Sequence, residues 1–537
     1  MRVLGINWRF HDASAALVDG DGKVLALAEE ERYSHVKHAW NTLPREAVAF
    51  CLRTGGISWR ELDVVAVGWD LRLLRPWSDA DTYELYAEIF GPGATGRDAP
   101  RLEFVEHHLA HACSAFYASG FAEGGVLVVD GTSEFAATSI YAARHGAGLT
   151  RRRHWSREYS LGTMYEAATR LLGFGGLEAG KTMGLAPYGI ADDHVVLPFG
   201  DEISTGRWGN KMLLDLPPDP SNPQVREAWT HYLRGRFGEV TRGQGELDRD
   251  PVAVRIAASV QRTVEEAMRA LHAETVSQSG SPNICLAGGV ALNCVSNGRL
   301  PEPLYIPPFP HDAGVSLGAA WAIAPPVCPV PLETPYLGGM LEAGPQIDQA
   351  RADGLRVEPF VPEAATELLL KGAIGAVAEG RAEAGPRALG HRSIIAIPRP
   401  ADVRDRINVL KGREPWRPLA PVTFPEYAPR LWPDQGRRAL YMVGAAAVSA
   451  HGQEVMPAVT HVDATTRPQV LPSGAAPVVE SILRQLQEAG LPPVMVNTSL
   501  NGRGEPIIDS AAQAIDSLKC LSLDFLILDE HLIRPPR

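Results

Sequence analysis

Three histidines stand close together in an apolar stretch, "EFVEHHLAHACSAFYASGF", at positions 107, 108 and 111. Residues four apart lie one turn above each other on an α-helix, so His107 and His111 could hold one metal ion between them. His108 and His111 are three apart and nearly as close, so spacing alone does not choose between the two pairs. The alternative is a partly exposed helix whose histidines cluster without binding anything.

A metal site needs more ligands than two imidazoles, and two aspartates stand at suitable places. Asp130 ends the strand-like run "VLVVD", and Asp312 precedes "AGVSLGAA". Strand ends and glycine turns line the cleft of α/β folds, so both carboxylates could converge on the histidines. As structural alternatives, Asp130 suits a plain turn and Asp312 a helix N-cap. His and Asp ligands suit iron, zinc and manganese alike.

A second chemical feature is a surplus of positive charge in the last third of the chain. Residues 381–417 hold nine Lys or Arg and four Asp or Glu, in a protein of net charge −12. The cations stand in "GRAEAGPRALGHRSIIAIPRP" and "INVLKGREPWRPLAP", among Gly and Pro rather than on one helix face. Guanidinium groups on loops suit bidentate contacts with phosphate, so we predict an anion or nucleotide-phosphate pocket. The alternative is a basic surface patch.

Two glycine-rich stretches bear on nucleotide binding. "GGLEAGKT", residues 175–182, satisfies the phosphate-loop pattern, which requires a strand before the loop and a helix after it. Here the preceding residues have helical periodicity, and Pro187 with two glycines would break a following helix, so the match is interpreted as chance. Lys181 stays a candidate for another role. In "AGGVALN", Gly288 and Gly289 would let the backbone approach a nucleotide closely.

The elements that must position these residues follow a repeated pattern. "VLGIN", "SAALVD" and "VLALAEEE" predict strands, the last two joined by an Asp-Gly turn. The strand–polar turn–strand unit recurs at "GVLVVDGTSE" and "ATSIYAAR". Such a repeat is typical of a duplicated actin-like or sugar-kinase-like fold, in which the two turns face each other and hold phosphate.

The remaining pattern predicts two domains. "LPREAVAFCLRTGG" and residues 251–277 predict helices, "LDVVAVGW" a strand, and "NICLAGGVALNCVSNGRL" a strand, a glycine turn and a helix start. Residues 325–345 are rich in Pro and Gly and lack periodicity. We therefore predict an α/β domain over residues 1–325, a linker over 326–354 and a second α/β domain over 355–537.

Composition narrows the classes of function. Hydrophobic residues make up 45% of the 537 residues and charged residues 21%, as in globular proteins that are soluble. No apolar run is long enough to cross a bilayer, and six scattered cysteines without a Cys-x-x-Cys pair predict reduced thiols in the cytoplasm. The negative net charge argues against general nucleic-acid binding.

Taken in order, the motifs resemble those of a known family. "EHHLAHACSAFYASGF", "DGTSE", "EAGKTMGLAPYG", "AGGVALN", "FPHDAGVSLGAA", "GPRALGHRSI", "NVLKGREPWRPLAP" and "NTSLNGRGEPI" are similar to motifs of the O-carbamoyltransferases of antibiotic and nodulation-factor biosynthesis, which include NodU and the cephalosporin and tobramycin enzymes. The resemblance covers nearly the whole chain. It implies an actin-like (duplicated ribonuclease-H-like) metal- and nucleotide-binding domain followed by a YrdC-like α/β domain.

The resemblance also implies an activity and its partners. The YrdC-like domain would make carbamoyl-adenylate from carbamoyl phosphate and Mg-ATP, and the actin-like domain would pass the carbamoyl group to a hydroxyl of a natural product, a sugar or a polyketide. A bound Fe(II) or another divalent transition metal would assist the transfer. No nucleic acid or membrane partner is implied, and a homodimer is left open.

Site residues follow by motif. The metal ligands would be His107, His111, Asp130 and Asp312, a set that chooses His107 over His108. His11, in "NWRFHDASAAL", and Lys37, in "YSHVKHAW", would face the transfer site, with His11 as the hypothetical general base. The residues that would bind ATP and carbamoyl phosphate are Arg387, Lys411, Arg417, Arg467, Asn497, Ser499 and Arg503. Those that would bind the adenylate at the transfer site are Gly131, Lys181, Gly288, Gly289 and Asn293.

Three other functions compete with this interpretation. An actin-like kinase or ATPase would explain the repeated turns but gives no role to the arginine-rich half. A binding protein would use metal and nucleotide only for structure or regulation. A metalloprotease would need the pattern H-E-x-x-H, which the histidine segment does not meet.

Overall fold

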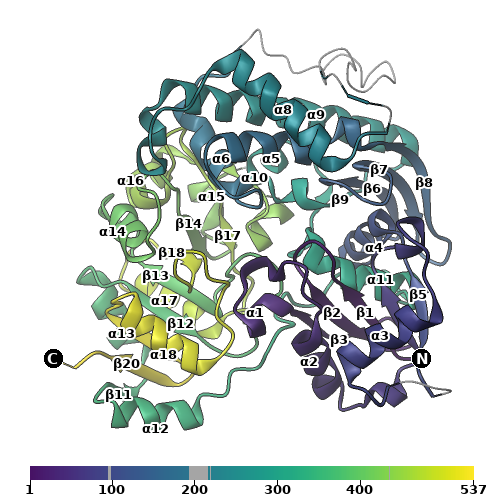
Figure 1. Ribbon diagram of the computed structural model, residues 1–537. Helices are drawn as coiled ribbons and strands as arrows, with labels where there is room; N and C mark the ends of the chain where they lie inside the picture. Colours follow the sequence, from purple (N-terminus) through teal and green to yellow (C-terminus); the bar gives the residue numbers. More distant parts are fainter. Residues whose placement is uncertain (95–97, 193–213, 215, 218, 434–435, 537) are drawn as a thin grey trace. The chain divides into compact units, whose positions relative to one another are not determined.

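The chain divides into two compact units in the computed structural model, which describes residues 1–94, 98–192, 214, 216–217, 219–433 and 436–536 (Figure 1). Unit 1 comprises Met1–Glu30 and Ala39–Glu333, and unit 2 comprises Glu31–His38 and Thr334–Arg537. The main boundary therefore falls after Glu333, inside the segment predicted as a linker. The short segment Glu31–His38 lies within unit 2 although unit 1 surrounds it in sequence.

Unit 1 contains two five-stranded sheets with the same topology. The first has the order β3-β2-β1-β4-β5 and the second β8-β7-β6-β9-β10. In each sheet the first strand pairs antiparallel with the second and parallel with the fourth. The strands are β1 Val3–Asn7, β2 Ser14–Val18, β3 Val24–Glu29, β4 Val64–Val67, β5 Arg101–Phe104, β6 Glu123–Val129, β7 Thr138–Arg144, β8 Gly148–Trp155, β9 Ile284–Ala287 and β10 Leu304–Tyr305. This duplication confirms the actin-like architecture expected from the repeated turns.

Helices separate and cover the two sheets of unit 1. Helix α2 (Arg45–Gly55) packs on β2 and β3, where the Cys51 thiol donates to the Ala15 carbonyl. The opposite face of that sheet meets α11 (Val315–Ile323), since the Ser14 hydroxyl donates to the Ala313 carbonyl. Helix α11 packs in turn on α4 (His107–Ser119), which lies on β6 and β9, and the long α9 (Pro251–Ser279) also packs on β6. The pair α4 and α11 thus forms the middle layer of unit 1 (Figure 1).

Glycines allow this middle layer to pack closely. A Cβ atom on Gly318 of α11 would lie 1.7 Å from the Ala110 carbonyl oxygen of α4, and one on Gly5 of β1 would lie 1.8 Å from the Ser316 carbonyl oxygen. Backbone atoms cannot yield as a flexible side chain can, so only glycine fits at either position. The separation of α4 from α11 is set by Gly318.

Gly318→Ala is expected to lower the free energy of unfolding by about 3 kcal/mol, because the added methyl group forces α11 away from α4. Gly235→Ala serves as the control, since Gly235 lies inside helix α8 (Asn222–Phe237) with no atom near an added Cβ. That change should raise stability by up to ~1 kcal/mol through helix propensity. Urea denaturation followed by circular dichroism compares the two; equal midpoints would contradict the packing argument.

The other helices of unit 1 flank these layers: α3 Asp79–Phe90, α5 Leu161–Leu171, α6 Ala179–Leu185 and α10 Cys294–Gly298. Helix α1, Glu30–Ser34, begins at the last residue of the first segment of unit 1 and runs into unit 2. The predicted helix over 251–277 is confirmed as α9, whose first turn is capped by the Asp250 carboxylate through the amides of Val252 and Ala253.

Unit 2 is built on a mixed eight-stranded sheet of order β11-β20-β19-β12-β13-β18-β14-β17. Its strands are β11 Arg356–Pro359, β12 Gly375–Ala378, β13 Arg392–Ala396, β14 Ala420–Thr423, β17 Gln469–Val470, β18 Val494–Ser499, β19 Phe525–Leu528 and β20 His531–Arg534. A small second sheet pairs β15 (Ala446–Ala447) with β16 (Thr465–Thr466). The helices are α12 Gly344–Ala352, α13 Pro362–Leu370, α14 Val403–Leu410, α15 Ala428–Leu431, α16 Ala450–Val455, α17 Pro477–Glu488 and α18 Ala511–Cys520.

Both faces of this sheet are buried. Ala376 and Ala378 of β12 face a core that includes Trp432, whereas Val377 between them faces a core that includes Ile482 of α17. The predicted linker is therefore ordered from residue 334 onward: helix α12 lies in it, and Leu341 is buried in the first core. Within the described part of the chain, no helix is both long and apolar enough to cross a membrane.

Candidate functional site

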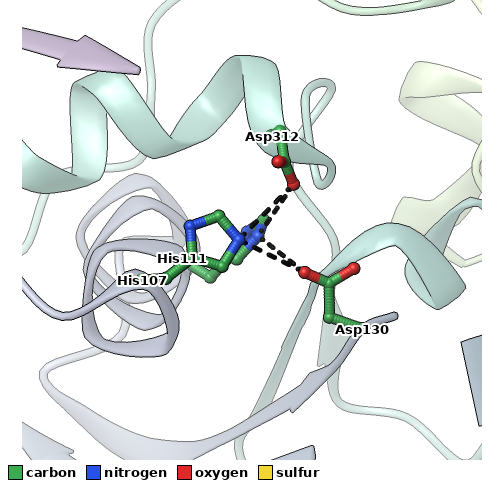
Figure 2. A group of neighbouring side chains, drawn as sticks. All are labelled: His107, His111, Asp130 and Asp312. Carbon is green, nitrogen blue, oxygen red and sulfur yellow. Dashed lines mark hydrogen bonds and ion pairs between the residues drawn. The ribbon is translucent and has the colours of Figure 1, made fainter. Parts of the chain in front are cut away.

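Four buried side chains of unit 1 converge on one point (Figure 2). The His107 Nε2 atom lies 3.3 Å from Asp130 Oδ2 and 3.6 Å from Asp312 Oδ1. The His111 Nε2 atom lies 3.5 Å from the same oxygen of Asp130 and 3.3 Å from that of Asp312. One donor atom from each of the four residues falls within 4.8 Å of the others. We call these residues the His/Asp cluster.

Three elements bring the cluster together. His107 and His111 occupy successive turns at the start of α4, Asp130 directly follows β6, and Asp312 precedes α11. Asp130 and Asp312 therefore lie where the sequence alternatives placed a turn and a helix start, but their carboxylates point at the imidazoles (Figure 2). The close packing of α4 on α11 sets the distance between the histidines and Asp312.

Neighbouring groups hold the His107 ring in one orientation. Its Nδ1 atom lies 3.0 Å from the carbonyl oxygen of Gly68, so Nε2 is the nitrogen directed at the carboxylates. Trp69 stacks on the same ring at 3.9 Å between centroids. The Glu134 carboxylate accepts hydrogen bonds from the amides of His107 (3.1 Å) and Asp70 (2.7 Å), and so caps the first turn of α4. Glu134 belongs to the motif "DGTSE" but was not among the predicted site residues.

The electrostatics of the cluster favour a cation. Burial alone would raise the pKa of Asp130 and Asp312, but the adjacent imidazoles outweigh it and hold both pKa values well below the usual range. Burial would lower the pKa of His107, but Asp312 and Asp130 raise it well above its usual value. The pocket thus presents two carboxylate charges that must be balanced by protons on the imidazoles or by a bound cation.

The donor set fits a divalent transition metal. The Nδ1 atom of His111 is buried and lacks a hydrogen-bond partner among the described residues, and the Nε2 atom faces the two carboxylates, as expected of a ligand. Two imidazole nitrogens and two carboxylate oxygens are a common set for zinc or iron. His108, by contrast, lies 2.8 Å from the Ser139 hydroxyl through Nδ1, and burial lowers its pKa well below the usual value. The geometry selects His107 and not His108 as the partner of His111.

His11 lies beside the cluster, in the turn between β1 and β2. Its Nδ1 atom is 2.9 Å from Asp12 Oδ2 and 3.8 Å from Asp312 Oδ2. Burial lowers its pKa, but the carboxylates of Asp312 and Asp12 outweigh burial and raise the pKa to about 9. As long as no cation neutralises these carboxylates, His11 is therefore an imidazolium at neutral pH. In that form it can donate a proton but cannot accept one.

The glycines and the lysine predicted at this site differ in their surroundings. An added Cβ on Gly131 would meet nothing, whereas Gly288, at φ +93°, would place one 2.3 Å from the Val129 carbonyl oxygen. The amide of Gly289 donates to Asp130 Oδ1 at 3.0 Å, so this turn adjoins the cluster. Asn293 caps α10 and donates to Gln261 Oε1. Lys181 lies on α6, pairs with Glu178 and is preceded by no strand, which confirms that the phosphate-loop match is chance.

Glu134→Gln is expected to weaken binding of a divalent metal about 10- to 100-fold, because an amide oxygen replaces a carboxylate that fixes the first turn of α4. Glu106→Gln is the matched control: Glu106 stands at the same helix end, but its carboxylate binds Arg151 and lies outside the cluster. Titration of zinc or cobalt against a competing chelator measures the affinity. A loss of the same size in both variants would contradict a specific role for Glu134.

Unit 2 contains a second polar centre, made of cations. Lys411 is buried just after α14, and its Nζ atom donates to Asn501 Oδ1 (2.9 Å) and to the backbone carbonyls of Asn501 (2.6 Å) and Ser499. Burial lowers the pKa of Lys411 well below its usual value, and the charges of Arg413, Arg417 and Lys37 lower it further. These cations repel one another, so the centre is built to receive an anion.

Arg413 lies at the middle of this group, although it was not predicted as a site residue. Burial lowers its pKa, and nearby Arg417, Arg467 and Arg387 lower it further. The predicted residues Arg387, Lys411, Arg417 and Arg467 thus share one neighbourhood with Arg413. Arg503 adjoins it through Glu414, which lies 3.8 Å from Arg503 Nη2 and 3.6 Å from Arg417 Nη1. We call Arg387, Lys411, Arg413, Arg417 and Arg467 the cationic cluster.

Other cations of the predicted pocket have structural roles. Arg392 is fully buried and donates to backbone carbonyls such as those of Glu379 and Gly380. Arg381 donates to the carbonyls of Leu337 and Gly338. Arg404 and Arg406 lie on helix α14, so not all of these cations are on loops. The surplus of charge therefore contains cations that tie the backbone together, such as Arg392 and Arg381, and others that gather around Arg413.

The polar residues predicted on β18 are also of two kinds. Asn497 is buried and donates to Gln469 Oε1 (2.5 Å) and to the Ala388 carbonyl, so it joins neighbouring strands and loops. Ser499 donates to Asn501 Oδ1 at 2.6 Å and supplies a carbonyl to Lys411. Ser499 and Asn501 therefore hold Lys411 in place, and Asn501 joins the site although it was not predicted.

Lys37 has a second neighbourhood that the motifs did not indicate. It lies in the segment Glu31–His38, which belongs to unit 2, and its charge contributes to the lowered pKa of Lys411. In that segment the Arg32 guanidinium donates to the Gly385 carbonyl at 2.7 Å. Lys37 therefore lies close enough to Lys411 to affect its pKa, and the segment enters unit 2 through long-range packing that sequence motifs do not reveal.

Comparison with known proteins shows the family of the chain. Residues 2–90 and 84–321 match the family described as carbamoyltransferase N-terminus, and residues 366–535 match carbamoyltransferase C-terminus. Nodulation protein NolNO of Sinorhizobium fredii is 32% identical over 563 residues, which cover 98% of this chain and 79% of that protein. Nodulation protein U of the same organism is 27% identical over 550 residues, 96% of each chain. The chain belongs to the carbamoyltransferase family, and its activity is that of a carbamoyl-transferring enzyme.

Proposed function

We propose that unit 2 is a YrdC-like domain that makes carbamoyl-adenylate from carbamoyl phosphate and ATP, and that unit 1 transfers the carbamoyl group to a hydroxyl of a natural product. The observation that carries this proposal is the presence of two chemically opposite centres, one in each unit. The His/Asp cluster attracts a cation, whereas the cationic cluster attracts phosphates. A kinase or hydrolase confined to unit 1 would leave the cationic cluster of unit 2 without a role.

In unit 2, the cationic cluster would bind the phosphates of both substrates. Attack of one water molecule on the carbonyl carbon of carbamoyl phosphate releases inorganic phosphate and gives carbamate, whose oxygen attacks the α-phosphorus of ATP while pyrophosphate departs. Such a transition state carries charge on several oxygens, so fixed cations contribute most of the catalysis. Lys411 is buried, Arg413 is half-buried, and their charges repel each other, so binding of an anion beside them relieves an unfavourable interaction. Arg417, Arg467 and Arg387 would complete the contacts with the phosphates.

In unit 1, the four residues of the His/Asp cluster would hold a divalent metal, Fe(II) or a similar ion. Such an ion would polarise the carbamoyl carbonyl or bind the adenylate phosphate. The amides around Gly131, Gly288 and Gly289 would lie against the adenylate, because Gly131 leaves room for a ligand and Gly289 already contacts Asp130. Asn293 and Lys181 would also bind the adenylate, at positions farther from the metal.

His11 would serve as the base. Neutralisation of Asp312 and Asp130 by a cation removes the main cause of its raised pKa, so the imidazole can then accept a proton. Asp12 holds its Nδ1 side, which directs Nε2 toward the acceptor. The acceptor oxygen attacks the carbamoyl carbon, its proton passes to His11, and AMP leaves. These three changes take place in one site, so the reactive carbamoyl group need not be exposed to water during the transfer.

The experiment that tests the proposed function uses the purified chain with Fe(II), radiolabelled pyrophosphate, ATP and carbamoyl phosphate. Incorporation of label into ATP only when carbamoyl phosphate is present supports formation of carbamoyl-adenylate. Incorporation that does not depend on carbamoyl phosphate, or AMP formation without it, would overturn the proposal in favour of an ATPase. Mass spectrometry of candidate hydroxyl metabolites then detects the mass gain of one carbamoyl group.

His11→Ala is expected to leave pyrophosphate exchange unchanged and to lower acceptor carbamoylation by about 10²- to 10⁴-fold, the usual contribution of a general base. His145→Ala is a control, since His145 is another imidazole of unit 1 and lies next to Phe116 and Tyr117, away from the cluster. Single-turnover transfer of labelled carbamoyl groups measures both variants. Near-normal transfer by His11→Ala would exclude this role.

A further inference from the structure

Two exposed aromatic side chains flank His11. Three aromatic residues other than histidine are exposed in the described part of the chain, and Phe10 (39% exposed) and Trp40 (47% exposed) are two of them. Phe10 directly precedes His11, and the Trp40 ring meets the His11 ring edge-on at 5.5 Å. Two exposed aromatic rings next to the proposed base are of the kind that line ligand sites, where apolar surface surrounds a few polar groups.

The backbone beneath these two rings is strained. Phe10 has φ +65°, Arg9 +77° and Asp12 +53°, and on the second loop Ala39 has +38° and Asn41 +48°. Non-glycine residues rarely adopt such values, and each costs about 1–3 kcal/mol. The amide of Asn41 donates to the Phe10 carbonyl at 3.0 Å, which ties the two loops to each other. Strain of this kind persists where the surrounding structure fixes the position of a side chain.

The aromatic residues connect directly to the His/Asp cluster. Phe10 meets Trp69 edge-on at 5.3 Å, and Trp69 stacks on His107 at 3.9 Å. Trp40 reaches the same centre through His11, whose Nδ1 lies 3.8 Å from Asp312. A molecule resting on Phe10 and Trp40 would therefore lie next to both the proposed base and the carboxylates of the cluster.

We propose that Phe10 and Trp40 form the acceptor subsite of unit 1 and bind the C–H face of a pyranose ring. This inference rests on the proposed transfer to a hydroxyl. Aromatic rings carry negative charge on their faces, which attracts the weakly positive C–H groups that line one side of a sugar ring. The hydroxyls at the ring edge stay free, so one of them can reach His11 while the apolar face is held. Phe10 and Trp40 are thus positioning and specificity residues, not catalytic ones.

The test compares ring and open-chain forms of the same polyols. Methyl glucoside, galactoside and mannoside are titrated against glucitol, galactitol and mannitol by saturation-transfer NMR, with the full chain, zinc and AMP present. At least one pyranoside is expected to bind ten-fold more tightly than its alditol, with transfer to its ring C–H protons. Trp40→Ala should remove that preference and Trp40→Phe should keep most of it. Equal binding of all rings and alditols, or a preference that survives both Trp40→Ala and Phe10→Ala, overturns the proposal.

Two further measurements distinguish failure of the acceptor subsite from failure of the proposed function. Carbamoyl-phosphate-dependent pyrophosphate exchange should be unchanged in Trp40→Ala, because exchange requires no acceptor. If the wild-type protein shows no exchange, the proposed function is wrong. The NMR titration still decides whether the site binds pyranose rings. The affinity for AMP should also be unchanged in Trp40→Ala. If Trp40→Ala weakens AMP and leaves pyranoside binding intact, the pair stacks the adenine base and the acceptor subsite is wrong. Tyr83→Ala, the loss of a similarly exposed ring elsewhere in unit 1, is the control.

Discussion

His111→Ala is expected to abolish metal binding and carbamoyl transfer while carbamoyl-phosphate-dependent pyrophosphate exchange continues at the wild-type rate. His111 supplies one of four donor atoms that lie within 4.8 Å of one another, and its other ring nitrogen, Nδ1, has no hydrogen-bond partner among the described residues. Without it, three donors remain around two buried carboxylates, and metal affinity should fall at least 100-fold. Exchange depends on the cationic cluster of unit 2, which His111 is not part of.

The matched control for this result is His108→Ala. His108 lies on the same helix, is equally buried and leaves a cavity of the same size, but its Nδ1 atom faces the Ser139 hydroxyl instead of the cluster. Metal content after anaerobic purification, measured by mass spectrometry, should be stoichiometric in His108→Ala and near zero in His111→Ala. Equal metal loss in the two variants, or a stoichiometric ion in His111→Ala, would contradict the assignment of ligands.

Local sequence signals were sufficient for the elements that carry the first centre. An Asp-Gly turn between apolar runs predicted the β2–β3 hairpin, and the repeated strand–polar turn–strand unit predicted the duplicated topology of unit 1. The i, i+4 spacing placed two imidazoles on one face of α4, but it could not separate His107 from His108. That choice depends on Gly68 and Ser139, which come from different strands and loops. Contacts of this kind are absent from any local pattern.

The same limit explains the residues that sequence reasoning missed or misplaced. A count of cations cannot tell Arg413, which faces other arginines, from Arg392, which is saturated by backbone carbonyls. The role of Glu134 appears only once its turn meets the start of α4. Likewise, the segment Glu31–His38 enters unit 2 through a contact between Arg32 and Gly385, which no periodicity records.

The proline- and glycine-rich stretch after residue 325 shows how composition can mislead. Its lack of periodicity predicted a linker, yet Tyr336 donates from its hydroxyl to the Leu389 carbonyl and stacks on His391 at 3.6 Å. Proline and glycine interrupt regular elements, but they do not prevent the intervening apolar side chains from packing. Burial of Tyr336 and Leu341 makes this stretch part of unit 2.

Arg413→Met is expected to lower the rate of carbamoyl-adenylate formation by about 10³-fold, the loss typical of a guanidinium that stabilises phosphoryl transfer. The same change should leave the nucleotide-free protein as stable as the wild type or more stable by about 1 kcal/mol, since burying a charge beside other cations is unfavourable. Among the described residues the guanidinium has a long contact, 3.4 Å, with the Thr498 hydroxyl and an attraction to Glu414, so few favourable interactions are lost. A charged side chain such as that of Arg413, which lowers the stability of the folded protein, is typical of a binding site.

Pyrophosphate provides the measurement that separates these effects. In urea denaturation, millimolar pyrophosphate should stabilise wild-type protein by filling the cationic cluster, and Arg413→Met should lose most of that stabilisation. Arg404→Met is the matched control, because Arg404 lies on α14 a few residues away, pairs with Asp405 and lies outside the cluster. If Arg413→Met unfolds more easily than Arg404→Met and still gains the full stabilisation from pyrophosphate, Arg413 is a structural residue and the phosphates bind elsewhere.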